Sequence, residues 1–303
     1  QPGSAPLGDG SGLAAHRYPA IVGDTLRNHP AAFYGRAQDA LLRAVFAGTA
    51  HANWMDWFLA QPPSAVPGWL AVEEFLWRDD ASSGLPPAPR TWIAPYNGHV
   101  FMRSNWFGDG LALDNGAVAV TFTAGDRLAA AQFYDQGSFT IARGADALSA
   151  RSGLSTEQGD SDHDANWTAR TLAANTILIC NPDETFDDIR SNVERAVWLN
   201  DCGQRSAAPY PSGPANLDDL IANWQAYDTG SITRRSEIGE ATYLRADLTG
   251  AYNSAFYTTP DNPPKTSLAL REVLYWRPDL VIIADHVVTT DTAYTPLATV
   301  HFE

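Results

Sequence analysis

The sequence predicts a helical region followed by a large antiparallel β-sandwich. Three apolar stretches within residues 1–88 repeat with the period of a helix. Beyond the Gly- and Pro-rich stretch ASSGLPPAP at 81–89, the apolar residues form many short runs separated by turn residues. This second pattern is typical of an antiparallel sandwich. We therefore divide the chain into a helical part, residues 1–88, and a sandwich, residues 89–303.

Three helices are predicted in the first part. The first covers residues 30–46, because Pro30 suits the first turn and apolar residues recur at helical spacing after it. The second covers residues 51–60 and ends before a Pro-Pro pair. The third covers residues 69–77, WLAVEEFLW. Their tryptophans could form a platform for a sugar ring or pack between the helices.

Strands are predicted wherever β-branched and aromatic residues form short runs between turn signals. Asn115-Gly116, Gly125-Asp126 and residues 277–279 supply such signals. The predicted strands are 100–103, 118–122, 139–141, 147–148, 176–179, 195–199, 241–246, 268–275 and 280–284.

Composition limits the class of protein. The chain has 303 residues, 45% of them hydrophobic, and a formal net charge of −15. This charge argues against nucleic acid and against anionic membrane surfaces as partners. No run is long and apolar enough to insert across a membrane. The two cysteines, Cys180 and Cys202, are either buried free thiols or one disulfide.

Three motifs lie in the centre of the chain: AQFYDQGSF at 131–139, RSG at 151–153 and RTLAANTIL at 170–178. In order and spacing they resemble the patterns HQHxDxGxF, DSG and RTxAHNTxL of the heparinase II/III-like polysaccharide lyases. NDCGQR at 200–205, DLTGAY at 247–252 and REVLYWRPDLVIIADHV at 271–287 extend this resemblance. Together the motifs cover the chain from Pro6 to His301.

The resemblance implies that the helices are the last ones of an (α/α) toroid and that the sandwich follows them. It also implies that a segment preceding residue 1 completes the toroid and is a partner of this chain. Association between copies of the chain is left open. Because lyases of this type act outside the cytoplasm, the resemblance implies a secreted or periplasmic protein and an oxidising compartment. A disulfide between Cys180 and Cys202 is therefore expected.

The chain departs from the family pattern at the metal ligands. The resemblance places the two histidines of the first motif on Ala131 and Phe133, the aspartate of DSG on Arg151 and the last histidine on Ala174. Phe133, Arg151 and Ala174 cannot supply the nitrogen or carboxylate ligands that zinc requires. We therefore predict that the family's zinc site is lost and that no cofactor is needed. Arg151 should turn outward or pair with an acid, of which Asp135 is nearest in sequence.

The resemblance implies cleavage of an acidic, uronate-containing polysaccharide by β-elimination. This reaction needs a neutralised carboxylate, a base and an acid. The catalytic candidates are Tyr134 and His163, for which the alternatives are a packed tyrosine and a solvated loop residue. The candidates for substrate binding are Arg170, Arg103, Gln132 and Asn175.

Structural alternatives stand beside these roles. Arg170 and Arg103 could form internal ion pairs, and Asn175 could tie the sandwich together through hydrogen bonds. The alternative function is a catalytically inactive relative that serves as a carbohydrate-binding or structural extracellular subunit. A glycoside hydrolase, which needs two carboxylates facing a cleft, is a third hypothesis, and the sequence locates no such pair.

Overall fold

The computed structural model describes residues 43, 45–50, 52–53, 56, 90–94, 98–105, 116–126, 133–143, 146–152, 163–185, 199–205, 215–253 and 262–302. Within the predicted helical region, Arg43, Val45, Ala52 and Asp56 are helical. Arg43 Nε donates to Asp56 Oδ1 at 2.7 Å, which connects the first two predicted helices. The third predicted helix lies outside the described residues, so the toroid and the boundary at residue 88 stay predictions.

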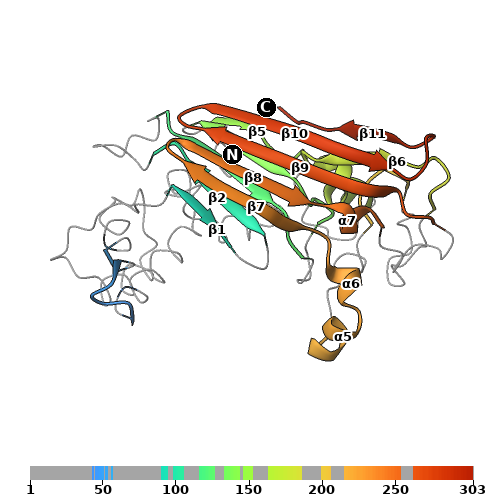
Figure 1. The fold of residues 1–303 in the computed structure, drawn as a ribbon, viewed down its shortest axis with the longest axis horizontal. Helices are drawn as coiled ribbons and strands as arrows, with labels where there is room; N and C mark the ends of the chain where they lie inside the picture. The colour runs from blue at the N-terminus through green and yellow to red at the C-terminus, as the bar shows by residue number, and fades with distance from the viewer. Residues whose placement is uncertain are drawn as a thin grey trace.

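A five-stranded antiparallel sheet forms the first layer (Figure 1). Its strands are β1 (Thr91–Ile93), β2 (His99–Arg103), β3 (Val118–Thr123), β4 (Phe139–Arg143) and β5 (Asp146–Ser149). Each strand pairs with its neighbour in sequence, in the order β1-β2-β3-β4-β5. All six residues of the central strand β3 are buried, which explains why its apolar run is continuous.

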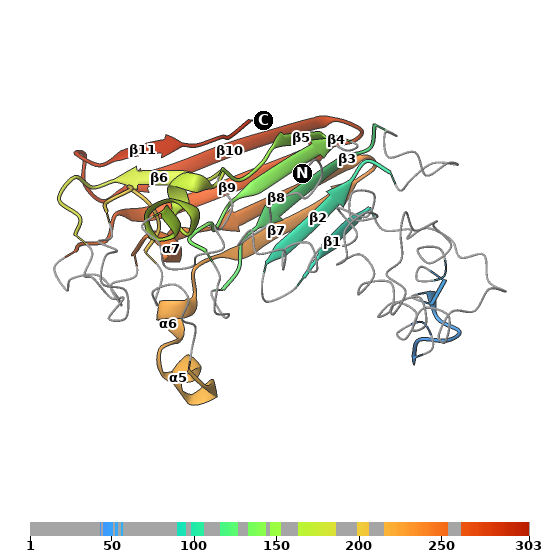
Figure 2. The ribbon, with the colours of Figure 1, turned by 180° about the vertical axis from the view of Figure 1, so that it is seen from behind.

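A four-stranded antiparallel sheet forms the second layer, in the order β10-β9-β8-β7. Its strands are β7 (Ser231–Ile238), β8 (Ala241–Asp247), β9 (Thr266–Trp276) and β10 (Leu280–Thr289). A separate two-stranded sheet pairs β6 (Ile177–Cys180) with β11 (Thr295–Ala298). Figure 2 shows β6 and β11 lying alongside the second layer.

Short helices connect these strands. They are η2 (Asp164–Thr168), η3 (Thr171–Ala173), α5 (Leu217–Ala222), α6 (Trp224–Tyr227) and α7 (Thr249–Asn253). Asn216 caps α5 by accepting a hydrogen bond from Asp219 N at 2.9 Å. No helix in the described part of the chain is long and apolar enough to cross a membrane.

The core lies between the two large sheets. Inward-facing residues alternate along β8 and β9, so that every second side chain is buried. One continuous cluster joins residues of the first sheet, including Val120 and Phe122, to residues of the second, including Leu244 and Val273. The antiparallel sandwich predicted from the period-two pattern is therefore present.

Some strands differ from the prediction. β1, β7 and β11 were not predicted. β1 has only three residues, and β7 and β11 are largely exposed and lack an apolar run. The predicted strand at 195–199 lies outside the described residues except for Leu199, which is not in a strand. The remaining predicted strands overlap β2, β3, β4, β5, β6, β8, β9 and β10.

Candidate functional site

The three central motifs converge at one end of the first sheet. Tyr134 N donates to Ala169 O at 3.1 Å, which connects the first motif to the third. Ser152 N donates to Ala173 O at 2.8 Å, which connects the second motif to the third. The family pattern has metal ligands at positions 133, 151 and 174. Each of these positions is next in sequence to a residue that makes one of these hydrogen bonds.

Arg151 occupies the centre of this convergence. Its Nη1 lies 3.0 Å from Asp135 Oδ2, and its Cζ lies 4.2 Å from the centroid of the Phe133 ring. The Arg151 side chain is only 2% exposed, and Ala174 is fully buried. The sequence left open whether Arg151 turns outward or pairs with an acid, and the structure shows the pair with Asp135.

These residues do not fit a zinc ion. A phenyl ring, a guanidinium and a methyl group stand at the three ligand positions, and none of them can donate an electron pair to a metal. The guanidinium supplies a positive charge beside Asp135 and would repel a metal cation. Among the described residues, no three His, Cys, Asp or Glu side chains lie together as a metal group.

Tyr134 and Arg170, two of the predicted site residues, lie next to each other. The Arg170 Cζ is 5.6 Å from the centroid of the Tyr134 ring. Arg170 Nη2 also pairs with Asp201 of the NDCGQR motif. Burial, the largest influence, would by itself raise the pKa of Asp201. Arg170, with help from Lys265 and the Gly203 N–H, holds this pKa below its ordinary value. Tyr134 and Arg170 are both buried.

Asn175, another candidate for substrate binding, makes four hydrogen bonds inside the protein. Its Nδ2 donates to Phe139 O at 2.8 Å, to Ser149 Oγ at 2.9 Å and to Ala150 O at 3.2 Å. Its Oδ1 accepts from His301 N at 2.6 Å. These contacts join β4, β5 and the segment that follows β11. Asn175 therefore ties the sandwich together through hydrogen bonds, as in the structural alternative named above.

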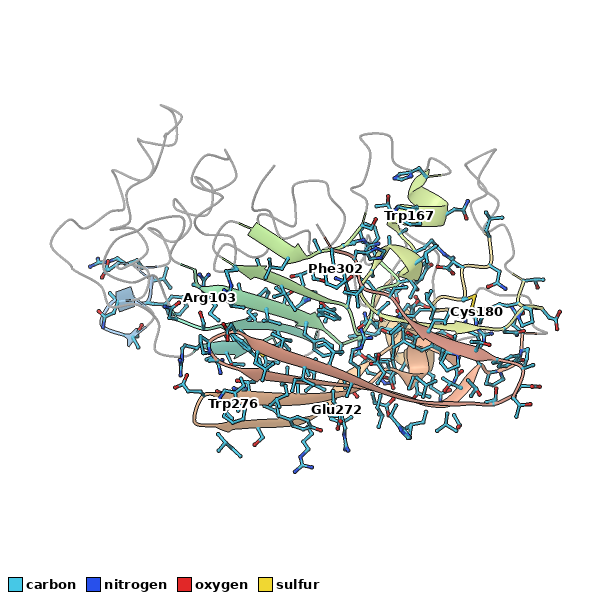
Figure 3. The ribbon with its side chains drawn as sticks, turned by 90° about the horizontal axis from the view of Figure 1, so that it is seen from above. Arg103, Trp167, Cys180, Glu272, Trp276 and Phe302 are labelled. Atoms are coloured by element: carbon cyan, nitrogen blue, oxygen red, sulfur yellow. A yellow bond between two sulfur atoms is a disulfide. The ribbon has the colours of Figure 1, made fainter. Side chains whose placement is uncertain are left out.

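The other candidates are spread over the molecule. Arg103 is buried at the end of β2, and its carbonyl accepts a hydrogen bond from Arg277 Nε at 2.6 Å. His163 is exposed immediately before η2. Gln132 lies outside the described residues. Figure 3 labels Arg103 and Trp167 far apart, and Trp167 belongs to the same short helix that follows His163. The roles of these residues stay predictions.

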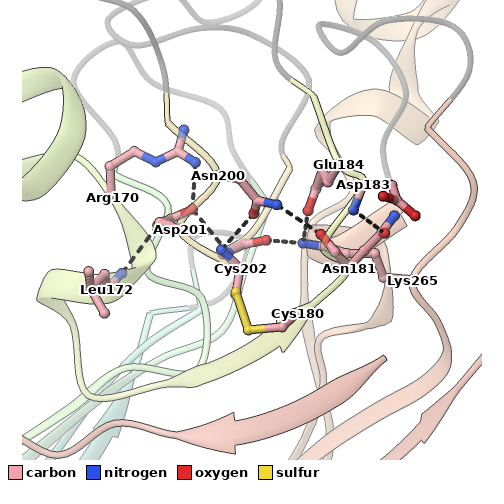
Figure 4. Close-up of a disulfide and its surroundings, with 11 residues drawn as sticks. Arg170, Leu172, Cys180, Asn181, Asp183, Glu184, Asn200, Asp201, Cys202 and Lys265 are labelled. Atoms are coloured by element: carbon pink, nitrogen blue, oxygen red, sulfur yellow. Dashed lines mark hydrogen bonds and ion pairs between the residues drawn. A yellow bond between two sulfur atoms is a disulfide. The ribbon is translucent and has the colours of Figure 1, made fainter. Parts of the chain in front are cut away.

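A disulfide joins Cys180 at the end of β6 to Cys202, with their Cα atoms 4.2 Å apart (Figure 4). Ile179 N also donates to Cys202 O at 2.8 Å, so the backbone itself holds the two segments together. The two Cα atoms are closer than the limit of about 7 Å beyond which cysteines cannot be bridged without backbone movement, and the expected disulfide is confirmed.

Beside the disulfide, Glu184 lies between two buried cations. Its Oε2 is 2.8 Å from Lys265 Nζ, and its Oε1 is 2.9 Å from Arg205 Nε. All three side chains are fully buried. Burial lowers the pKa of Lys265 to about 8, because the attraction of Glu184 offsets desolvation only in part. The carboxylate makes the burial of both cations tolerable.

A pocket that the sequence did not indicate opens at the edge of the sandwich. Its volume is about 560 Å³. The polar and aromatic side chains that line it are Asp126, Trp224, Asp228 and Arg235. Residues of β1 and β7, and of the segments that adjoin β1, β2 and β3, complete its walls. Burial, together with the nearby charge of Asp228, raises the pKa of Asp126 to about 6. From sequence, Gly125-Asp126 was interpreted only as a turn signal, and nothing linked it to Trp224 or Asp228.

Comparisons with known proteins place this geometry in context. No family model matches the chain, and no curated protein matches it. Its structure is similar to that of heparan sulfate lyase HepC from Pedobacter heparinus. The two share 13% sequence identity with a TM-score of 0.48, over 85% of this chain and 28% of HepC.

A second similar structure is heparinase III, the BT4657 gene product, with methylated lysines. The identity is 13% and the TM-score is 0.45, over 84% of this chain and 27% of the other. The chain thus spans less than a third of the length of either of these solved structures.

Proposed function

We propose that this chain is the sandwich part of an extracytoplasmic polysaccharide lyase of the heparinase II/III-like type. It acts on a uronate-containing polysaccharide by β-elimination and works without a metal in the sandwich. One observation carries the proposal: the segments holding positions 133, 151 and 174 meet around Asp135, and those positions carry Phe, Arg and Ala.

The convergence supports the alignment of the three motifs with the family pattern. A wrong alignment would have scattered these positions over the sandwich, because they come from segments up to 41 residues apart in the chain. Instead, Arg151 contacts Phe133, and its neighbour Ser152 bonds to Ala173. The guanidinium of Arg151 balances the charge of Asp135, so the fold keeps its electrostatic balance at this place without a divalent cation.

The buried pair of Tyr134 and Arg170 is the part of the chain best suited to acid–base chemistry. A tyrosine hydroxyl can act as the acid or the base of an elimination when the substrate reaches it. The disulfide between Cys180 and Cys202 favours an oxidising compartment, because disulfides persist outside the reducing cytosol. Both features support the proposed secreted or periplasmic lyase.

A carbohydrate-binding or structural subunit without catalysis is the second candidate. The observation in its favour is that Arg170 and Asn175 are fully buried and use their polar groups inside the protein. In this case the fold has been kept while the chemistry has been lost.

The test is to incubate the protein with heparan sulfate, hyaluronan and alginate and to follow absorbance in the near ultraviolet. β-Elimination leaves an unsaturated uronate that absorbs there, whereas a binding subunit leaves each polymer intact. Tyr134→Phe should abolish the signal, and Tyr243→Phe on the outer face of the second sheet should not. Retention of all three polymers on the protein without any unsaturated product would select the second candidate.

A further inference from the structure

We propose that the pocket at the edge of the sandwich binds a sugar unit that carries no negative charge. Asp126, Trp224 and Asp228 would supply the recognition. This goes beyond the proposed lyase reaction, which acts on an anionic uronate, because it assigns a separate sugar site with the opposite preference for charge.

The pocket has the size and position of a binding site. Its volume of about 560 Å³ falls within the range of about 300–1,000 Å³ usual for small-molecule sites. Its walls come from the ends of β1 and β3 and from the segment that joins α6 to β7. β1 and β7 are both edge strands of their sheets, and they lie on the same side of the sandwich (Figures 1 and 2). The pocket that they help to line therefore opens at its rim.

Trp224 provides an apolar surface at this rim. It is the first residue of α6 and is 43% exposed. Ile93 and Ile232 continue the apolar wall from β1 and β7. An indole ring combines a broad flat apolar face with one hydrogen-bond donor. A pyranose ring matches it, since one face of the sugar presents C–H groups and its edge presents hydroxyls.

Two carboxylates face the same space. Ionised carboxylates only accept hydrogen bonds, and bonds from hydroxyl donors to a charged acceptor are roughly twice as strong as neutral ones. Asp126 and Asp228 can therefore bind the hydroxyls of a sugar whose ring lies on Trp224. Asp126 and Asp228 come from segments about 100 residues apart, so the sandwich brings them together.

The pocket disfavours further negative charge. The raised pKa of Asp126, caused by burial and by Asp228, shows that one carboxylate already destabilises the other. Arg235, the cation in the described lining, is paired with Glu237 and so does not reverse the sign. A uronate or sulfate group would add a third negative charge to the same pocket, where the two carboxylates would repel it.

The experiment measures binding of disaccharides to the full chain by saturation-transfer NMR and calorimetry. The neutral probes are cellobiose, lactose, maltose and N,N′-diacetylchitobiose, and the anionic probe is digalacturonate. At least one neutral probe should bind at least about tenfold more tightly than digalacturonate. Trp224→Ala should weaken the bound neutral probe about fivefold. The matched control is Trp276→Ala, which removes a tryptophan that is 57% exposed on the second sheet.

Asp126→Asn provides a readout that a purely structural role would not move. It removes one negative charge, so digalacturonate should gain affinity relative to the neutral probe. Cooperative thermal unfolding, as in the original protein, establishes that both variants fold. If no neutral probe binds, the proposal is overturned. It is also overturned if neither Trp224→Ala nor Asp126→Asn changes the binding of the neutral probes. If the protein binds a neutral sugar but has no lyase activity, only the proposed function is refuted. If it has lyase activity but binds no neutral sugar, only the proposed sugar site is refuted.

Discussion

Arg271 joins the second sheet to the motif region, and its removal should destabilise the protein strongly. On β9, its Nε and Nη2 each lie 2.7 Å from one oxygen of Asp285 on β10. Its Nη1 donates to Gly137 O at 2.7 Å and to Asn175 O at 2.8 Å. The Arg271 side chain is 1% exposed and that of Asp285 is 21% exposed. The guanidinium therefore satisfies acceptors in two layers at once.

The magnitude follows from these contacts. Removing one partner of a buried ion pair costs about 3–5 kcal/mol, and partial exposure lets Asp285 regain some hydration. We expect Arg271→Met to lower the free energy of unfolding by about 3 kcal/mol. In a double-mutant cycle with Asp285→Asn, the coupling energy should be about 2 kcal/mol.

The pair of Arg143 and Asp279 is the matched control. It is also a contact between an arginine and an aspartate, but its side chains are 49% and 55% exposed and a single contact of 3.2 Å joins them. Its coupling energy should stay below about 0.5 kcal/mol. Urea unfolding measures all the variants, and an unchanged m-value shows that the same surface unfolds. Equal coupling energies in the two cycles would refute the reasoning from burial.

Three further predictions concern the disulfide, the metal and pH. Replacing Cys180 and Cys202 together by Ser should lower the free energy of unfolding by about 3 kcal/mol, because the bond closes a loop with a sequence separation of 22 residues; reductant should then no longer affect the melting temperature. Because Phe133 and Arg151 stand at ligand positions, chelators should leave the melting temperature unchanged, and stoichiometric zinc by elemental analysis would contradict this. The folded-state pKa of Asp126 is about 6, above its ordinary value of 3.8, so the stability from its proton is fully present below about pH 4 and is lost as the pH rises through 6. Asp126→Asn should flatten this part of the curve of melting temperature against pH, and an unchanged slope would show that the pKa of Asp126 is not raised.

The sequence by itself indicated the sandwich. Strands such as β3 and β9 were predictable, since burial of one or both faces leaves a local signature of apolar residues. β7, with the sequence SITRRSEI, escaped prediction because it is an edge strand whose residues are mostly exposed. The pairing of Arg151 with Asp135 was one of two outcomes considered, because an arginine at a lost metal position needs a counter-charge when buried.

Only the tertiary structure decided which polar residues are internal and which face solvent. Sequence patterns identify Arg170 as a motif residue, but its burial against Tyr134 and its pairing with Asp201 depend on segments 30 or more residues away. The pocket is a stronger case, since Asp126 and Trp224 meet only through the packing of two sheets. Periodicity reports the environment of neighbouring residues along one strand or helix, whereas a site built from chain-distant segments has no local period to detect.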